Sequence, residues 1–327
     1  MPVEIHAPAD RPAASKSDTR GADLAAPDLV IGIINNMPDS ALRSTERQFG
    51  SLLAAASGSR RIELRYSSIP EVPRGAEASE RVLDAYWPLA KLLDARLDGL
   101  IVTGNEPRAA SLRDEPYWAR LGEILAFAEG HVPSSIWSCL AAHAAVLQLD
   151  GIERRRLAKK RSGVYTHELS CDHQLAAGLP DSLPTPHSRW NDLAEGDLVR
   201  AGYQILAASP SNGVDVFLRQ RASLLVFLQG HPEYEPETLL REYRRDVKRF
   251  VDDEISQFPD IPTGYLSAAA EQALLEFRDR ALSRSSRSIA DLFPYEAAAS
   301  GIDNRWRPPA VRFYRNWLDW LATNRRR

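Results

Sequence analysis

The apolar segment Leu29-Val30-Ile31-Gly32-Ile33-Ile34 constrains the fold of this chain more than any other feature. A continuous run of aliphatic residues, most of them β-branched, is typical of a strand whose two faces are both buried. Strand-like segments at 62–67, at 97–104 and directly before Cys139 alternate with helix-like segments such as 118–130. This alternation predicts an α/β fold with a doubly wound, mostly parallel sheet.

The second half of the chain is richer in strands than the first. Four more strands are expected there, at 161–170, 204–209, 215–219 and 224–229. Helices are expected at 236–250, 265–284 and 310–325. Residues 183–190, which include prolines 184 and 186, are expected to form a loop that offers polar groups.

Three regions follow from this organisation. Residues 1–27 mix charges with alanine and proline and contain no continuous apolar segment, which argues against a secretory signal. We expect a disordered leader at 1–27, an α/β catalytic domain at 28–250, and a helical C-terminal extension at 251–327 packed on the same domain.

The composition excludes several classes of function. A net charge of −3 over 327 residues gives no global electrostatic case for binding nucleic acid or an anionic membrane surface. No run of 18 apolar residues predicts a transmembrane helix. The two cysteines lack CxxC spacing, which favours a reducing, cytoplasmic environment. The seven histidines form no HxxxH pair, so no metal site is expected.

Cys139 is the first candidate for chemistry. It ends an apolar stretch and precedes Leu140-Ala141-Ala142, which begins a helix-like segment. A thiol at a helix N-terminus has a lowered pKa, and the Leu140 N–H can face a developing oxyanion. Gly104, at another predicted strand end, can supply a second donor. The alternative is a buried core cysteine, which is the commoner fate of an isolated cysteine.

His231 and Glu233 follow the strand expected at 224–229. In an extended segment, residues two apart lie on one side, so one ring nitrogen of His231 can meet a thiol while the other donates to Glu233. The alternative is a surface turn in which Glu233 only caps the next helix. His143 competes as a base, but its position four residues after Cys139 projects it beside the helix, which favours a structural or surface role.

The dense basic run at 154–161 admits two interpretations. It resembles a nucleic-acid patch, but it lacks interleaved aromatic residues and the chain is not basic overall. A solvated face with one functional cation therefore fits better.

Taken in order, these motifs resemble the homoserine O-acyltransferase (homoserine O-succinyltransferase) family, which is related to class I glutamine amidotransferases. The matching segments are Ile34-Asn35-Asn36-Met37-Pro38, Thr45-Glu46-Arg47-Gln48-Phe49, Asp98-Gly99-Leu100-Ile101-Val102-Thr103-Gly104, Pro116-Tyr117-Trp118, Cys139, Ser162-Gly163-Val164-Tyr165, His187-Ser188-Arg189, Gly230-His231-Pro232-Glu233-Tyr234, Arg245-Asp246-Val247, Trp306-Arg307 and Asn316-Trp317-Leu318. Each motif is weak alone, and the ordered set is specific.

The resemblance implies a ping-pong acyltransferase. Cys139 would take the acyl group from acyl-CoA as a thioester, with His231 as the base held by Glu233. The family's substrate-binding positions fall on Lys160, Ser188 and Arg245. No tightly bound cofactor is implied, acyl-CoA is a co-substrate, and the family implies a homodimer.

Two departures bear on specificity. Asp39 and Ser40 stand where the family usually has a lysine, and Arg108 occupies a position associated with the choice of acyl donor. A cation there can pair with a succinyl carboxylate or point into solvent, so succinyl is preferred over acetyl. Homoserine is the expected acceptor, and serine stays open because one methylene discriminates only ~10–200-fold.

Two other classes of function stay open. A glutamine amidotransferase-like hydrolase would use the same triad, although no synthetase domain to receive ammonia is evident. A binding or regulatory protein that has lost catalysis is disfavoured, because all three triad residues are present.

Overall fold

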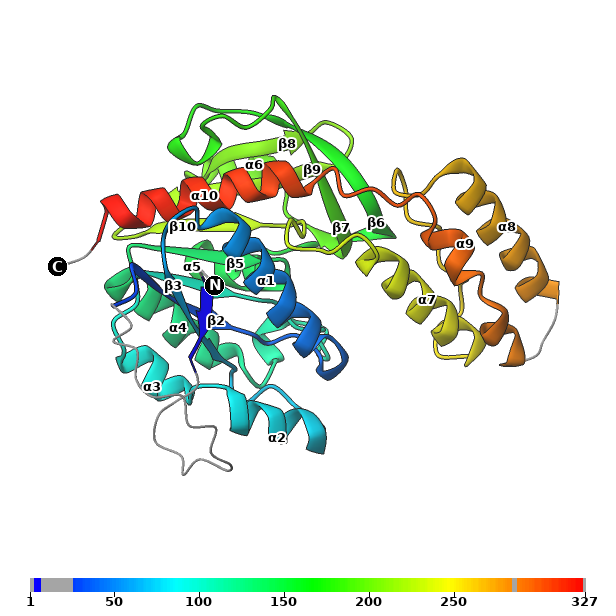
Figure 1. Ribbon diagram of the computed structural model, residues 1–327, viewed down its shortest axis with the longest axis horizontal. Helices are drawn as coiled ribbons and strands as arrows, with labels where there is room; N and C mark the ends of the chain where they lie inside the picture. The colour runs from blue at the N-terminus through cyan, green and yellow to red at the C-terminus, as the bar shows by residue number, and fades with distance from the viewer. Residues whose placement is uncertain (1–2, 7–25, 284–286, 326–327) are drawn as a thin grey trace.

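The computed structural model describes residues 3–6, 26–283 and 287–325, and Figure 1 shows their arrangement. The described residues include one sheet with the strand order β1-β3-β2-β4-β5-β10-β9-β8-β6-β7. The strands are β1 (Val3–Ile5), β2 (Leu29–Ile34), β3 (Ile62–Ser67), β4 (Gly99–Val102), β5 (Ser134–Ser138), β6 (Arg155–Leu169), β7 (Ser182–Asp192), β8 (Gln204–Ser209), β9 (Gly213–Gln220) and β10 (Leu224–Leu228). The helices are α1 (Leu42–Ala56), α2 (Ala76–Ala85), α3 (Leu89–Asp94), α4 (Trp118–His131), α5 (Leu140–Asp150), α6 (Glu195–Arg200), α7 (Thr238–Val251), α8 (Ala268–Ser283), α9 (Tyr295–Ala299) and α10 (Arg307–Thr323).

The sheet has a parallel part and an antiparallel part. Strands β1, β3, β2, β4, β5 and β10 run parallel, whereas β9, β8, β6 and β7 continue the sheet through antiparallel pairs. The predicted α/β fold with a mostly parallel doubly wound sheet is therefore confirmed. Because β4, β5 and β10 are parallel neighbours, their carboxyl ends meet at one edge, where ligands bind in open sheets.

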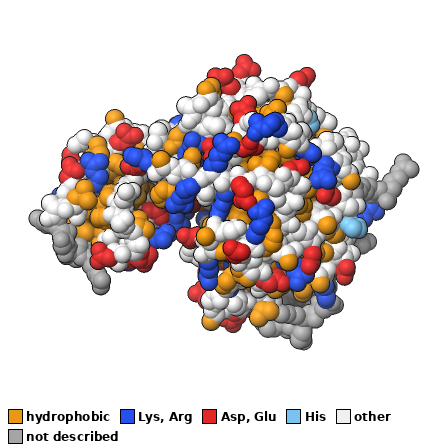
Figure 2. Space-filling model, turned by 180° about the vertical axis from the view of Figure 1, so that it is seen from behind, with side chains coloured by type: hydrophobic (Ala, Val, Ile, Leu, Met, Phe, Trp, Pro, Cys, Tyr) orange, Lys and Arg blue, Asp and Glu red, His pale blue; other side chains and the backbone are white. Residues whose placement is uncertain are grey.

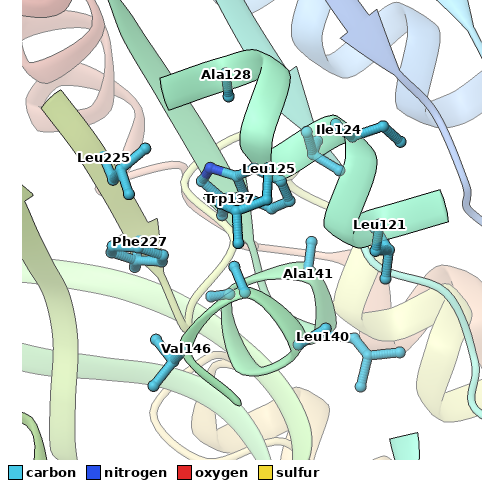
Figure 3. Packing of buried hydrophobic residues seen from close by; sticks show 14 of the residues in the cluster. Leu121, Ile124, Leu125, Ala128, Trp137, Leu140, Ala141, Val146, Leu225 and Phe227 are labelled. Atoms are coloured by element: carbon cyan, nitrogen blue, oxygen red, sulfur yellow. The ribbon is translucent and has the colours of Figure 1, made fainter. Parts of the chain in front are cut away.

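Helices cover both faces of the parallel part. One face packs against α1 and α10, and the other packs against α3, α4 and α5. In β10, Val226 faces the first layer and Phe227 the second, as the alternation of strand side chains requires. Figure 3 shows the second layer, with Trp137 of β5 between Leu125 of α4 and Phe227. The continuous apolar runs of the central strands thus reflect burial on both faces.

A third cluster of buried side chains lies to one side of the sheet, in a lobe built from α7, α8 and α9 (Figure 1). Leu239, Leu240, Tyr243 and Val247 of α7 belong to this lobe cluster. Helix α10 returns from the lobe to the sheet and packs on α1. The division therefore differs from the expected boundary at 250/251, because the apolar side of α7 faces the lobe and α10 completes the core of the sheet.

The N-terminal segment also differs from expectation. Within the leader expected at 1–27, Val3–Ile5 forms the edge strand β1, which pairs in parallel with Ile62–Leu64 of β3. The rest of that expected leader up to residue 25, apart from His6, lies outside the described residues. Three alternating residues are too few for periodicity to reveal a strand.

The loop expected at 183–190 is wrong, because these residues lie in β7. Prolines at 184 and 186 suggested a break, but β7 is the last strand of the sheet, and proline is tolerated in edge strands. The two prolines are two residues apart, so both occupy strand positions whose backbone nitrogen and carbonyl point away from β6. The Pro186 carbonyl accepts a hydrogen bond from the His231 N–H at 2.8 Å. The proline segment therefore supports the loop that follows β10.

No helix in the described ranges combines the length and the apolar character that crossing a membrane requires.

Candidate active site

Cys139 lies at the turn between β5 and α5. Its backbone angles are φ 52° and ψ −112°, an unusual conformation for a residue with a side chain. Its N–H donates to the Leu228 carbonyl of β10 at 2.7 Å, and the buried small residues Ala141 and Ala142 follow. Such a backbone costs on the order of 1–3 kcal/mol and persists only where surrounding contacts enforce it. The turn leaves Cys139 partly exposed directly before the first residue of α5.

His231 and Glu233 form the buried pair that the sequence suggested. The Nδ1 atom of His231 lies 2.8 Å from Oε1 of Glu233, and both side chains are buried. The ring of Tyr234 stacks on the imidazole with the centroids 4.3 Å apart. The carboxylate therefore fixes the ring orientation and leaves Nε2 for a partner on the other side.

Cys139 is the group that acts on His231 together with Glu233. Burial alone would lower the pKa of His231, but the negative charges of Glu233 and Cys139 and the hydrogen bonds to both raise this pKa well above its usual value. The three residues thus have the geometry of a nucleophile, a base and an orienting carboxylate.

Gly104 and Leu140 bring two backbones together beside the thiol. A Cβ atom added to Gly104 would lie 2.8 Å from the Leu140 Cβ and 2.9 Å from the Leu140 nitrogen. Only glycine permits this approach between the end of β4 and the start of α5. Because the first N–H groups of a helix have no partner within the helix, this is where an oxyanion can be received.

A buried network holds the other side of the His231 loop. The Gly230 N–H donates to Oδ1 of Asp215 in β9 at 2.8 Å, and the same oxygen lies 3.5 Å from Nε2 of His187. Nδ1 of His187 accepts from the Arg189 guanidinium at 3.2 Å. Neutral His187 therefore carries its proton on Nε2, which lies near Asp215 without a hydrogen bond to it. The network fixes the backbone next to the base.

His167, His187 and Asp215 also place ligand atoms within 4.8 Å of one another, a spacing that can suit a metal ion. The tautomer opposes this use, because the His187 nitrogen that faces Asp215 carries the proton while Arg189 occupies the other nitrogen. Neutral histidine ligates a metal only through an unprotonated nitrogen. The hydrogen bond from Arg189 thus argues against a metal at His187, while both ring nitrogens of His167 are buried with no hydrogen-bond partner among the described residues.

His143 is buried in α5, and its Nε2 atom lies 2.8 Å from the Gln229 amide oxygen. Burial lowers its pKa to about 4, so it is neutral at physiological pH. Gln229 also accepts from the Leu193 N–H and donates to the Val214 carbonyl. His143 therefore supports the residue that precedes Gly230, which favours the structural interpretation.

Lys160 and Arg245 converge on one carboxylate. Nζ of Lys160 lies 2.6 Å from Asp246, and Arg245 makes two contacts to Asp246 at 3.0 and 3.1 Å. Burial would raise the pKa of Asp246, but the two cations lower it. The structure thus brings together two of the three residues expected to bind substrate, one from β6 and one from α7.

Ser188 and Arg108 occupy less constrained positions. Ser188 is partly buried in β7 opposite Ser162 of β6. Arg108 is exposed, and its backbone N–H is held by the buried carboxylate of Glu115 at 2.6 Å. The role of Arg108 in donor choice stays a prediction.

Sequence reasoning missed Asp215, Glu115 and Arg154. Burial lowers the pKa of Arg154, while the charges of Tyr117, Glu115 and Cys139 raise it. This partly buried guanidinium therefore lies within electrostatic range of the nucleophile. Asp215 had a usable signal, since a carboxylate between Val214 and Val216 is unusual in a strand buried on both faces.

Comparison with known proteins matches residues 11–326 to the family model described as homoserine O-succinyltransferase. A homoserine O-succinyltransferase from Rhodopseudomonas palustris is 45% identical over 321 residues, which cover 98% of this chain and 96% of that protein. One from Methylorubrum extorquens is 45% identical, with 89% and 86% covered. The solved structure of a glutamine amidotransferase from Methylobacillus flagellatus aligns at TM-score 0.47 and 16% identity, covering 89% of this chain and 94% of that chain.

Proposed function

This chain belongs to the homoserine O-succinyltransferase family, and we propose that it transfers the succinyl group of succinyl-CoA to the hydroxyl of L-homoserine through a thioester on Cys139. The observation that carries the mechanism is the turn at Cys139, where a positive φ presents the thiol to the buried His231–Glu233 pair.

The first half-reaction exchanges one thioester for another. The Cys139 thiolate attacks the donor carbonyl, and the N–H groups of Gly104 and Leu140 receive the negative charge on its oxygen. The C–S bond to CoA then breaks, and the imidazolium of His231 gives its proton to the departing sulfur. Because a thioester replaces a thioester, this step has little net free-energy cost.

The second half-reaction reverses these roles. His231 takes the proton from the acceptor hydroxyl as its oxygen attacks the acyl-Cys139 carbonyl. The C–S bond to Cys139 breaks, and the thiolate returns to the protonated His231. Glu233 keeps the ring in one tautomer throughout. Lys160 and Arg245 are the cations that would bind the carboxylate of the amino acid, for which arginine offers two parallel donors.

Intact mass spectrometry tests the covalent step. The protein is mixed with succinyl-CoA or acetyl-CoA without acceptor, and Cys139→Ala is compared with Cys171→Ala as the matched cysteine control. We expect a succinyl adduct on wild type and on Cys171→Ala, none on Cys139→Ala, and discharge of the adduct by homoserine more rapidly than by serine. If neither donor forms an adduct or releases CoA, even with both acceptors present, the acyltransferase mechanism is wrong.

A further inference from the structure

A cavity of about 680 Å³ lies between α7 and the segment that contains Phe293 and Tyr295 in the helical lobe. Four cations line it, namely Arg241, Arg244, Arg245 and Lys248. Their spacing of three, four and seven residues places them on one face of α7. The adjacent face of the helix packs into the lobe cluster, and Val247 and Phe293 of that cluster also line the cavity. The helix therefore presents a row of positive charge to a hollow, which we call the α7 groove.

The charges of the α7 groove are only partly balanced. Two carboxylates, Asp252 and Asp291, also line it, against four cations. Three of the four cations have carboxylate partners, namely Arg241 with Glu237, Arg245 with Asp246 and Lys248 with Asp252. Arg244 instead lies over the Tyr295 ring, with 5.6 Å between its guanidinium carbon and the ring centroid. Within the described residues, Arg244 pairs with no carboxylate. Arg244 is therefore the groove cation that is available to an anionic ligand without the loss of an ion pair, and Lys248, with a partly exposed carboxylate partner, lies one turn further along α7.

The α7 groove adjoins the active site by two routes. Thr238 begins α7 five residues after Glu233, and Lys248 lies about 15 Å further along the helix axis at 1.5 Å per residue. In addition, Arg249 of α7 lies 3.6 Å from Glu106, which is two residues beyond Gly104. The groove is thus tied to both the loop of the base and the loop expected to receive the oxyanion. Figure 2 shows Lys and Arg side chains on this face of the molecule, on the lobe and on the sheet domain beside it.

We propose that the α7 groove binds the 3′-phosphorylated ADP portion of the CoA donor, so that the pantetheine arm runs from the groove to Cys139. This inference rests on the proposed function for the identity of the ligand. Its phosphates match a row of arginines, which bind phosphate oxygens through pairs of N–H donors. The partly buried Tyr295 ring, which Arg244 already contacts, adds an aromatic group to the lining of the groove.

Kinetics with two donors test this proposal. The variants are Arg244→Ala and Arg244→Ala/Lys248→Ala, with Arg280→Ala, an exposed cation of α8 outside the groove, as the control. The donors are succinyl-CoA and the succinyl thioester of N-acetylcysteamine, which lacks the nucleotide. We expect KM for succinyl-CoA to rise roughly 10- to 100-fold in the groove variants, with kcat and the use of the short thioester close to wild type. Arg280→Ala should leave KM and kcat unchanged with both donors.

Direct binding separates this proposal from the proposed function. Calorimetry with adenosine 3′,5′-bisphosphate should show binding to wild type that weakens with salt and is lost in the double variant. An unchanged KM for succinyl-CoA, or an equal loss with both donors, would overturn the groove assignment. If wild type binds the bisphosphate but neither thioester acylates it, the groove stands and the proposed chemistry fails.

Discussion

Replacing Gly104 with alanine tests whether the end of β4 and the start of α5 form the oxyanion site. The added Cβ would lie 2.9 Å from the Leu140 nitrogen, whereas ordinary contacts begin at 3.4 Å. Relief therefore requires the two backbones to separate by about half an ångström, the difference between these distances. Both obstructing atoms are backbone or Cβ atoms, so rotation of a side chain cannot relieve the contact.

The magnitude follows from the position of the donors. Loss of one oxyanion donor costs about 10²–10³ in the catalysed rate, and a displacement on the ångström scale can cost about 10²-fold. We expect Gly104→Ala to slow acylation of Cys139 by about 10²–10³. Overpacking should lower the free energy of unfolding by only about 1–3 kcal/mol. The effect should fall on kcat more than on KM, because the charge on the oxygen develops only in the transition state.

Single-turnover acylation, read as CoA release and as intact mass, measures this rate, and thermal unfolding measures stability. Gly130→Ala in α4 is the matched control, since its added Cβ meets no atom within 4 Å. It should acylate at the wild-type rate. A folded Gly104→Ala protein that also acylates at the wild-type rate would refute the assignment of these backbones to the oxyanion site.

Two further predictions concern histidines. Glu233→Gln removes the negative charge that is the leading cause raising the pKa of His231. Acylation of Cys139 should slow about 10²–10⁴-fold, and the alkaline limb of its pH profile should move to lower pH. An alkaline limb that does not move would contradict the role of Glu233. Burial lowers the pKa of His143 to about 4. Between pH 6.5 and 4 the unfolded chain therefore binds a proton at this residue that the folded chain does not. Up to roughly 3 kcal/mol of the free energy of unfolding is lost as pH falls through this window. His143→Gln should flatten that slope in urea unfolding measured from pH 7.5 to 4.5, and an unchanged slope would show that other groups set it.

The central strands could be predicted because their burial is uniform. Leu29–Ile34 and Leu224–Leu228 are apolar throughout, since helices cover both faces of the sheet at those strands. Their order in the sheet could not be predicted in the same way. It depends on which strands pair, and local apolar runs do not encode pairing between segments far apart in sequence.

The strand at Ser182–Asp192 shows the limit of local signals. Proline argues against a central strand, but it allows either a loop or an edge strand. Residues 182–192 form the edge strand. Only the finished sheet reveals that the carbonyl of the buried Pro186 points away from β6 and accepts from the His231 N–H. The candidate catalytic residues could be predicted from their type and spacing, whereas the backbone contacts that position them could not.

The site lies where the sheet changes direction, and this explains how both sides of His231 are fixed. β10 is parallel to β5, so its carboxyl end emerges beside Cys139, as the carboxyl ends of parallel neighbours do. The same strand is antiparallel to β9, so the start of β9 lies opposite the end of β10 and places Asp215 against Gly230. A wholly parallel sheet would have put the amino end of the neighbouring strand far from this loop. The change of direction thus supplies the nucleophile on one side of the base and a buried carboxylate on the other.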